Sequence, residues 1–166
     1  MTFYTVFVID LASRRVLIVG STRHPHEIFM RQAVRTMTAA DDGLLAQRRV
    51  LICDRDTKWS APVRARLAET GIRVVQTPFH APNANAYAER FVRSIKQECL
   101  SRVIPFGDRH LRRMIAEYVE HYHRERNHQG LANELIDGAS NRAGTLGRIR
   151  RRPRLGGLLN YYCRAA

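Results

Sequence analysis

The chain opens with two apolar runs that have the composition of paired β-strands. Residues 3–11 (FYTVFVIDL) and 16–19 (VLIV) are rich in β-branched and aromatic side chains. Such side chains favour extended backbone, and the short segment between the runs, 12–15 (ASRR), is mostly polar. Two such runs separated by a short polar segment predict an antiparallel hairpin.

The next periodic segment has the spacing of an amphipathic helix. Between 27 and 37, apolar residues recur at i, i+4, as Phe29, Ala33 and Met37 do. Residues at this spacing share one face of an α-helix, so we expect a helix over 27–37 that buries this face. The segment 41–43 (DDG) after it predicts a polar loop.

The middle of the chain has the order strand, acid, helix, glycine, strand. Residues 50–53 (VLIC) form a short continuous apolar run, which suits a strand buried on both faces. Ser60 is the expected N-cap of a helix that runs through Thr70, with Pro62 in its first turn. Residues 72–75 (IRVV) predict a second strand, which is parallel to the first because a helix connects them.

The second half of the chain is mostly helical by its pattern. Pro and Asn residues predict a loop over 77–85, and helices are expected from 86 to about 100 and from about 108 through 122. Residues 148–154 (RIRRRPR) form a basic run in a loop-like tail. The combination of strands and helices predicts an α/β fold.

Composition restricts the partner. The 166 residues are 45% hydrophobic and 26% charged, as expected for one globular domain. Lys and Arg outnumber Asp and Glu by 28 to 15, and the resulting net charge of +13 indicates a polyanionic partner. Apart from Lys58 and Lys96, every one of these cations is arginine, which suits bidentate contacts with phosphate.

Other classes of protein are excluded by further features of the sequence. No stretch of the sequence has the length and hydrophobicity of a membrane-spanning helix. The cysteines are far apart and form no C-x-x-C pair: Cys53, Cys99 and Cys163. This usage suits a reducing cytoplasm and argues against a disulfide framework or a zinc knuckle.

An acid directly follows the strand predicted over 50–53. Asp54 would lie at the carboxyl end of that strand, where open α/β sheets place ligands, and Asp56 follows two residues later. An Asp after a strand also commonly forms a turn by accepting a hydrogen bond from the backbone two residues on. Both roles stay open on this pattern alone.

A second acid, Glu89, falls near the start of the helix predicted from residue 86, where the helix dipole favours an ionised carboxylate. Arg93 and Lys96 lie at i+4 and i+7, so one helix face is suited to a metal at its end and phosphates along its side. The plainer alternative for Arg93 is an ion pair with Glu89, worth roughly a few tenths of a kcal/mol. The buried stripe is expected to hold Phe91, Val92, Ile95 and Cys99.

Four motifs follow one another along the chain. They are residues 7–14 (FVIDLASR), 54–56 (DRD), 82–91 (PNANAYAERF) and 122–131 (YHRERNHQGL). In this order they resemble the second strand, the second catalytic Asp, the helix with the catalytic Glu and the closing segment of one group of enzymes. That group is the catalytic core of insertion-sequence transposases and retroviral-type integrases. The last two motifs together are specific.

The resemblance implies an RNase H-like fold, a mixed sheet flanked by helices, over residues 1–135, with 136–166 as a basic C-terminal tail. It implies DNA transposition or integration by a DDE-type polynucleotidyl transfer, in which DNA strands are cleaved and joined. Asp54 and Glu89 would be the catalytic residues and would hold a pair of Mg²⁺ (or Mn²⁺) ions.

The resemblance also implies DNA as the partner, both transposon ends and target, and a cytoplasmic homo-oligomer that holds two DNA ends. The residues expected to contact DNA are basic ones near Asp54, on the helix of Glu89 and in the tail: Lys58, Arg90, Arg93, Lys96, Arg150, Arg151 and Arg152. The alternative for the tail is a solvated end. His121, His123 and His128 lack the spacing of helix-borne zinc ligands, so we favour packing or DNA contact for them.

The sequence departs from the family at its front. The family uses three acids, and the first lies on a strand that would precede the hairpin predicted here, so we expect that strand and its Asp to be missing. Asp10 aligns with the end of the second strand, and we assign it to the hairpin turn rather than to catalysis. The alternative function is a catalytically inactive DNA-binding remnant, and a basic ribosomal or chromatin-type module ranks below it.

Overall fold

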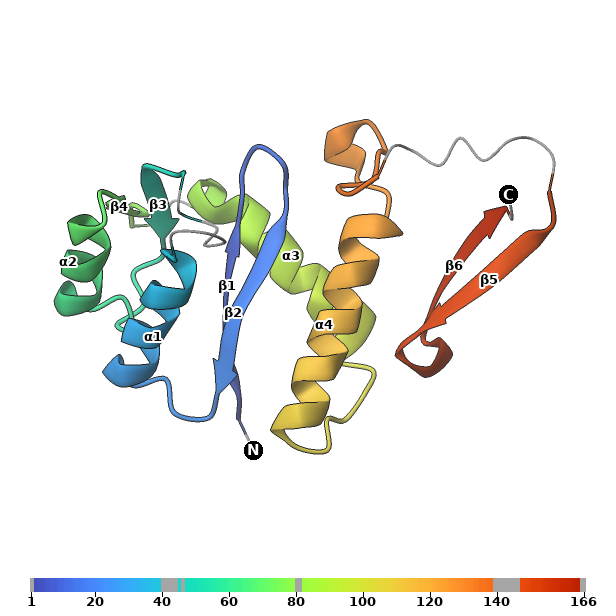
Figure 1. Ribbon diagram of the computed structural model, residues 1–166, viewed down its shortest axis with the longest axis horizontal. Coiled ribbons are helices and arrows are strands. Elements are labelled where there is room, and N and C mark those ends of the chain that lie inside the picture. The colour runs from blue at the N-terminus through green and yellow to red at the C-terminus, as the bar shows by residue number, and fades with distance from the viewer. Residues whose placement is uncertain (1, 40–44, 46, 80–81, 139–146, 165–166) are drawn as a thin grey trace. The chain divides into compact units, whose positions relative to one another are not determined.

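A computed structural model describes residues 2–39, 45, 47–79, 82–138 and 147–164 (Figure 1). The structure is mixed α/β, and its contacts divide it into two compact units. Unit 1 comprises Met1–Ile9 and Leu17–Glu89, and unit 2 comprises Asp10–Val16 and Arg90–Ala166. The predicted loop at 41–43 lies outside the described residues.

The predicted N-terminal hairpin is confirmed. Strands β1 (Tyr4–Ile9) and β2 (Val16–Thr22) form a two-stranded sheet (Figure 1). Asp10 closes the turn, since its N–H donates to the carbonyl of Arg15 at 2.9 Å and its carbonyl accepts from the N–H of Arg14 at 2.8 Å. The turn residues belong to unit 2, while most of the two strands belongs to unit 1.

Helix α1 (Glu27–Met37) begins and ends where the apolar spacing predicts. It buries one face, made of Met30, Ala33, Val34 and Met37. Phe29, which the pattern assigns to the same face, packs half-buried against this core.

The strand–helix–strand unit is also confirmed. Strands β3 (Val50–Cys53) and β4 (Arg73–Gln76) are parallel, and helix α2 (Ala61–Glu69) connects them. One detail was wrong: β3 is not buried on both faces, because Val50 and Ile52 are 43% and 40% exposed while Leu51 and Cys53 are buried. In this two-stranded sheet only the face toward the helices is packed into the core.

The predicted cap of α2 is correct in position but not in chemistry. Ser60 is the N-cap residue, yet its side chain makes no capping hydrogen bond, and its buried hydroxyl has no hydrogen-bond partner among the residues that the structure describes. An N-cap side chain bonds the N–H of the second or third helical residue, and the second is Pro62, which has no N–H.

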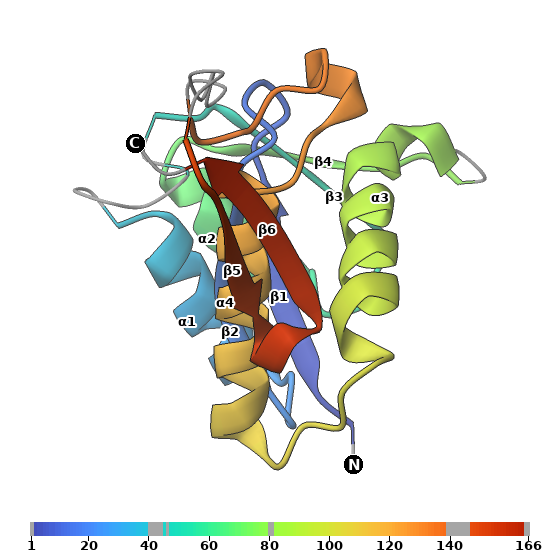
Figure 2. The same ribbon diagram turned by 90° about the vertical axis from the view of Figure 1, so that its right-hand side faces the viewer.

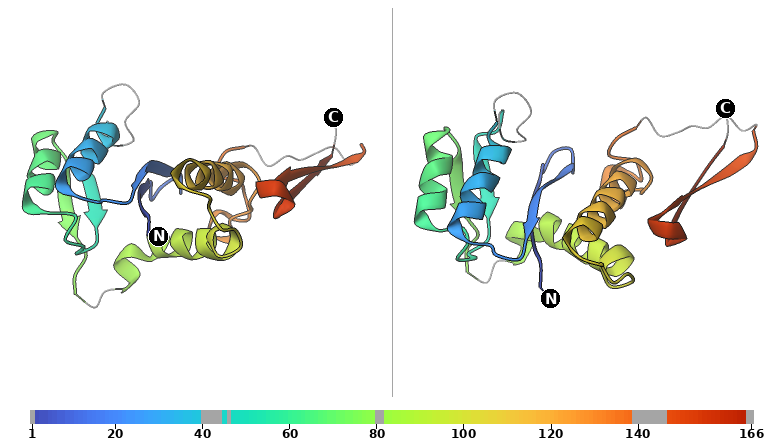
Figure 3. Two further views of the ribbon diagram at one scale, coloured as in Figure 1. Left: turned by 90° about the horizontal axis from the view of Figure 1, so that it is seen from below. Right: turned by 60° about the horizontal axis from the view of Figure 1, so that its bottom comes forward.

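The core of unit 1 is a cluster of buried apolar side chains from β1, α1, β3 and α2 and from the segments next to them. In Figure 3, α1 and α2 lie side by side, next to β3 and β4. The buried cluster comprises Val8, Met30, Val34, Met37, Leu45, Leu51, Val63, Leu67 and Ile72. Trp59, directly after the acidic loop, packs half-buried against this cluster.

Unit 2 is built around a helix pair. A 3₁₀ turn, η1 (Pro82–Asn85), leads into α3 (Ala86–Ile95), which runs on as a π-helical turn, η2 (Lys96–Leu100). Unit 2 contains α3 from Arg90 onward, while η1 and the first residues of α3 belong to unit 1. The single helix predicted from 86 to 100 is therefore an α-helix with a wider final turn. Helix α4 (Asp108–Arg124) packs on α3 in unit 2 through aromatic rings, with Phe91 5.1 Å from Tyr122 between ring centroids.

The tail contains a β-hairpin that the sequence pattern did not predict. Strands β5 (Ile149–Arg154) and β6 (Leu159–Arg164) are antiparallel, and Figure 2 shows them side by side. The turn η4 (Leu155–Gly157) between them includes Gly156 at φ +66° and Gly157 at φ +97°, which are conformations that favour glycine. Among the described residues, no helix combines the length and apolar character needed to cross a membrane.

Candidate metal and DNA site

Asp54 leaves the sheet at its carboxyl edge. It follows the last residue of β3 directly, its side chain is exposed, and one carboxylate oxygen accepts the N–H of Asp56 at 3.2 Å. The turn contact predicted for an Asp at this place is therefore present. It occupies one lone pair of one oxygen, so a ligand role is compatible with it.

Asp56 is committed to a different partner. The ammonium of Lys58 donates to both of its carboxylate oxygens, at 2.9 and 2.7 Å, and the Lys58 N–H donates at 2.8 Å. The hydrogen bond from the Lys58 side chain is the main reason that the pKa of Asp56 is lowered. Lys58, which the resemblance assigned to DNA, is therefore an ion-pair partner within the same loop.

Arg55 connects the loops that follow the two parallel strands. Its Nε–H donates to the carbonyl of Thr77 at 2.9 Å, and its guanidinium lies 3.9 Å from the ring centroid of Phe79. Because β3 and β4 are parallel, both loops leave the same edge of the sheet. In the sequence, only its place beside Asp54 marks Arg55 as a residue of this site.

Glu89 lies in the first turn of α3 and is exposed. The expected faces of this helix are confirmed: Phe91, Ile95 and Cys99 are buried, Val92 is half-buried, and Arg93, Lys96 and Gln97 are exposed. In the described part of the chain, Glu89 and Arg93 do not form the ion pair that was the plainer alternative.

Asp54 and Glu89 differ from most acids of the described residues. Nine others form ion pairs with Arg, Lys or His: Glu27, Asp56, Glu69, Glu98, Asp108, Glu117, Glu120, Glu125 and Asp137. Neither Asp54 nor Glu89 has such a partner there. Glu134 shares this feature, but it lies in a loop of unit 2. The carboxylates at the β3 and α3 termini thus have no cationic partner within the ranges that the structure describes.

The donor atoms at these two positions are the type that Mg²⁺ and Mn²⁺ prefer, namely carboxylate oxygens. Within the described ranges, no group of three or more His, Cys, Asp or Glu side chains is arranged to hold a metal ion. The turn role expected for Asp10 is confirmed, because its Oδ1 accepts the N–H groups of Ala12 and Ser13 at 2.8 and 3.1 Å.

A second charged cluster lies in unit 2, where Glu125 is surrounded by cations. Its side chain is 1% exposed and accepts from Arg154 at 2.8 Å and from His121 at 3.0 Å, with Arg152 at 3.6 Å. Burial alone would raise the pKa of Glu125, but the hydrogen bonds from Arg154 and His121 outweigh it and lower the pKa. The cluster joins β5 to α4.

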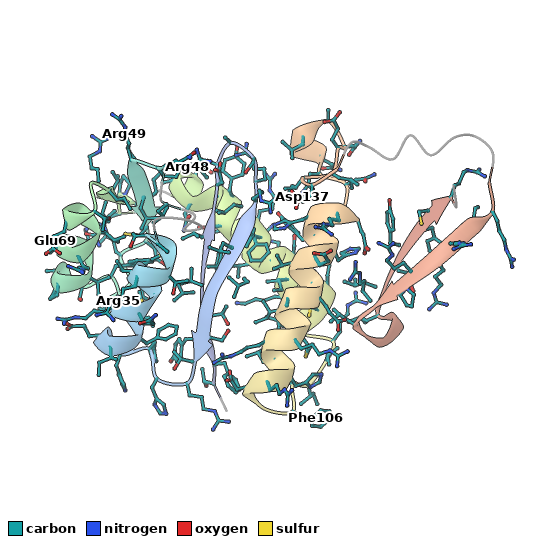
Figure 4. The ribbon with its side chains drawn as sticks, in the orientation of Figure 1. Arg35, Arg48, Arg49, Glu69, Phe106 and Asp137 are labelled. Carbon is teal, nitrogen blue, oxygen red and sulfur yellow. The ribbon has the colours of Figure 1, made fainter. Side chains whose placement is uncertain are left out.

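The histidines of α4 and the following loop have structural partners. His123 Nε2 accepts the N–H of Val16 at 3.0 Å, and His128 Nε2 donates to the carbonyl of Tyr122 at 2.8 Å. Burial lowers the pKa of both imidazoles. Asp137, labelled in Figure 4, forms an ion pair with Arg15 of the hairpin turn. The packing role expected for His123 and His128 is confirmed.

The remaining residues assigned to DNA are in unit 2 and are exposed. Arg90, Arg93 and Lys96 lie on α3 and η2, and residues 150–152 lie on β5. Of these, Arg152 also contributes to the Glu125 cluster. Exposed guanidinium and ammonium groups are the side chains that bind phosphates.

Comparison with known proteins finds a family model that matches part of the chain. Residues 70–134 match the family described as the integrase core domain. The matched segment contains β4, α3 and α4, and with them Glu89, Arg90, Arg93 and Lys96, whereas Asp54 precedes it. A search of curated proteins finds no match.

Proposed function

We propose that this chain acts in DNA integration or transposition, and that Asp54 and Glu89 hold divalent metal ions for DNA strand cleavage and strand transfer. The match of residues 70–134 to the integrase core domain supports the general function. The supporting observation is electrostatic. In a chain with 28 Lys and Arg residues, these two acids are exposed and have no cationic partner among the described residues.

The elements that carry the two acids are suited to this role. Asp54 stands at the end of a strand and Glu89 in the first turn of a helix, so both are attached to regular structure rather than to a long loop. The Arg55 hydrogen bond to Thr77 fixes the loop next to Asp54 against the loop that leads toward α3. Rigid attachment matters because metal sites tolerate little displacement of their ligands.

The chemistry divides between the ions and the chain. Ions bound there would neutralise the phosphate and promote attack by water or a 3′-hydroxyl. Arg93 and Lys96, along the exposed face of α3, would hold DNA phosphates, and their charge would add salt dependence to binding. By pairing with Asp56, the Lys58 ammonium would be kept from pairing with Asp54.

We extend the proposal to the fold and the domain division. The parallel β3–α2–β4 unit, the β1–β2 hairpin and the helix pair support an RNase H-like arrangement. Residues 1–135 would be the catalytic core, and 136–166 a basic segment that adds DNA contacts.

Assembly and location follow from the same function. Joining two DNA ends requires two active sites at one place, so we propose a homo-oligomer, which sizing of the purified protein with light scattering tests. The free cysteines Cys53 and Cys99 are buried. They suit the reducing cytoplasm in which we place this chain.

The test is a Mg²⁺-dependent nicking assay on supercoiled DNA with the full chain. Asp54→Asn and Glu89→Gln remove one charge each without changing shape, and each is expected to slow cleavage by about 100-fold or more. Glu69→Gln is the matched control, because Glu69 is an exposed acid of unit 1 that is already paired with Arg66. It is expected to cleave within twofold of wild type.

Cleavage by wild type that is no faster than cleavage by both variants would overturn this function. Binding of DNA without any cleavage would instead support the catalytically inactive DNA-binding remnant.

A further inference from the structure

The β5–β6 hairpin has two faces of different chemistry. In a strand, successive side chains point to opposite faces, so every second residue shares a face. Arg152 and Arg154 point toward α4, where both meet Glu125. The other residues of each strand therefore face away from α4, and those of β6 are the exposed ones of its alternating burial pattern.

This outer hairpin face is defined by Ile149, Arg151, Asn160, Tyr162 and Arg164. The strand register places Arg151 opposite Tyr162 and Ile149 opposite Arg164. Tyr162 is 62% exposed and Ile149 is 60% exposed, so an aromatic ring and an aliphatic side chain lie open beside two guanidinium groups. Residues 147–164 include no Asp or Glu, so the face has no acid of its own strands to neutralise it.

Local hydrogen bonds hold the two arginines on this face. Arg151 Nε donates to the side-chain oxygen of Asn160 at 2.7 Å, and Arg164 donates to the carbonyl of Gly147 at 3.0 Å. A Cβ at Gly157 would lie 3.4 Å from a guanidinium nitrogen of Arg151. Each guanidinium uses one N–H in these contacts and keeps others for a ligand.

The hairpin is also fixed as a whole. The Glu125 cluster holds β5, and the N–H of Leu155 donates to Glu117 Oε2 at 3.0 Å. Glu117 lies on α4 and Glu125 directly follows it, and both carboxylates bind the hairpin on the side that faces α4. A face held in this way loses little conformational entropy when it binds a ligand.

We propose that the outer hairpin face binds single-stranded DNA, with Tyr162 stacked on an unpaired base and Arg151 and Arg164 on the flanking phosphates. That the ligand is DNA rests on the proposed function. That the DNA is single-stranded is inferred from the side chains of the outer hairpin face. An exposed aromatic ring between guanidinium groups matches a chain of alternating bases and phosphates. In a duplex the base faces are covered by their neighbours, so the Tyr162 ring has no partner there.

The test compares binding of a fluorescent oligothymidine with binding of a duplex of equal length by the full chain, followed by anisotropy without metal. Tyr162→Leu is expected to weaken single-strand binding about tenfold and to leave duplex binding within twofold. Tyr162→Phe keeps the ring and is expected to match wild type. Circular dichroism and the urea midpoint verify that each variant is folded.

One arginine of the outer hairpin face and one arginine outside it provide a matched pair. Arg151→Gln is expected to reduce the slope of log affinity against log salt for the oligothymidine by about 0.7, the value for one lost phosphate contact on a single strand. Arg66→Gln removes the same charge from an exposed arginine of α2 that is already paired with Glu69, and we expect it to leave that slope within about 0.3 of wild type.

The inference is overturned if Tyr162→Leu binds the oligothymidine as wild type does, or if it weakens single strand and duplex equally. Failure of this inference can be told apart from failure of the proposed function, because Asp54→Asn is expected to lose nicking and to keep oligothymidine binding. Absence of nicking together with a Tyr162-dependent preference for single strands would overturn the proposed catalysis and support this inference.

Discussion

Two pairs of acids in this chain have opposite surroundings: Asp54 and Glu89 at the β3 and α3 termini, and Glu98 and Glu125 beside α4. In unit 2, Glu125 and Glu98 are enclosed by cations and hydroxyl groups, with Arg126 and Tyr118 both donating to Glu98 at 3.0 Å. In unit 1, Asp54 and Glu89 are exposed and have no cation among the described residues. One set stabilises the fold, and the other remains available to a ligand.

Burial explains the difference. A carboxylate that loses its water must gain partners of comparable strength, or its desolvation destabilises the protein. A carboxylate in solvent has no such requirement, so leaving it without a cation costs little stability. The comparison therefore predicts large stability effects in unit 2 and large activity effects at Asp54 and Glu89.

The largest stability effect is expected at Glu125. Glu125→Ala removes the carboxylate shared by Arg154, Arg152 and His121, and leaves Arg154, a side chain 20% exposed, without its main partner. We expect a loss of about 3 kcal/mol in the free energy of unfolding, measured with urea.

Glu120→Ala is the control on the same helix, because Glu120 forms an exposed pair with Arg124. Its cost should stay within about 0.5 kcal/mol. Equal losses for the two substitutions would show that the buried Glu125 cluster stabilises unit 2 no more than an exposed ion pair does.

A smaller effect is expected at Glu98. Glu98→Gln keeps an acceptor for the Tyr118 hydroxyl but loses the charge that Arg126 binds. The expected loss is about 1.5 kcal/mol in the same urea assay, with Gln97→Ala, an exposed neighbour, changing stability by less than about 0.5 kcal/mol. If Glu98→Gln unfolds at the wild-type urea concentration, this ion pair does not stabilise unit 2.

The pH dependence should be smaller again. The pKa values of His123 and His128 are lowered by burial, so below the ordinary value of 6.5 the unfolded chain binds protons that the folded chain does not. Stability is therefore full above that value and falls as the pH falls toward the folded pKa values. Urea midpoints between about pH 7.5 and 5 measure this fall.

His123→Gln separates the two imidazoles. Its amide oxygen can still accept the N–H of Val16 but does not titrate, so we expect the pH dependence to be halved. A variant with the full wild-type pH dependence would show that His123 is not one of the titrating groups.

The sequence predicted best what depends on local pattern. The apolar spacing over 27–37 gave α1 with its bounds, and the run at 50–53 gave β3, because a helix or strand with one packed face carries its period in the sequence. The turn role of Asp10 was predictable for the same reason, since the side chain bonds N–H groups two and three residues away.

What failed depends on tertiary partners. The β5–β6 hairpin was missed because arginines occupy both faces of β5 and Pro153 interrupts it, so no apolar alternation marks the strand. The partner of Arg154 is Glu125, 29 residues away, and neither position identifies the other. The prediction that β3 is buried on both faces was wrong, because the sequence of a strand does not show how many layers pack around it.

For the proposed site, the sequence predicted which residues form it but not their surroundings. The positions of Asp54 and Glu89 after a strand and at a helix start came from the sequence, and their lack of cationic partners came from the structure. The affinity of the two carboxylates for a divalent metal ion can be measured directly.

Titration of the full chain with Mn²⁺, followed by the electron paramagnetic resonance signal of the free ion, is that measurement. We predict binding by wild type that Mg²⁺ displaces, and at least about tenfold weaker binding by Asp54→Asn and by Glu89→Gln. Equal Mn²⁺ affinity in wild type and both variants would contradict the assignment of these two carboxylates as metal ligands.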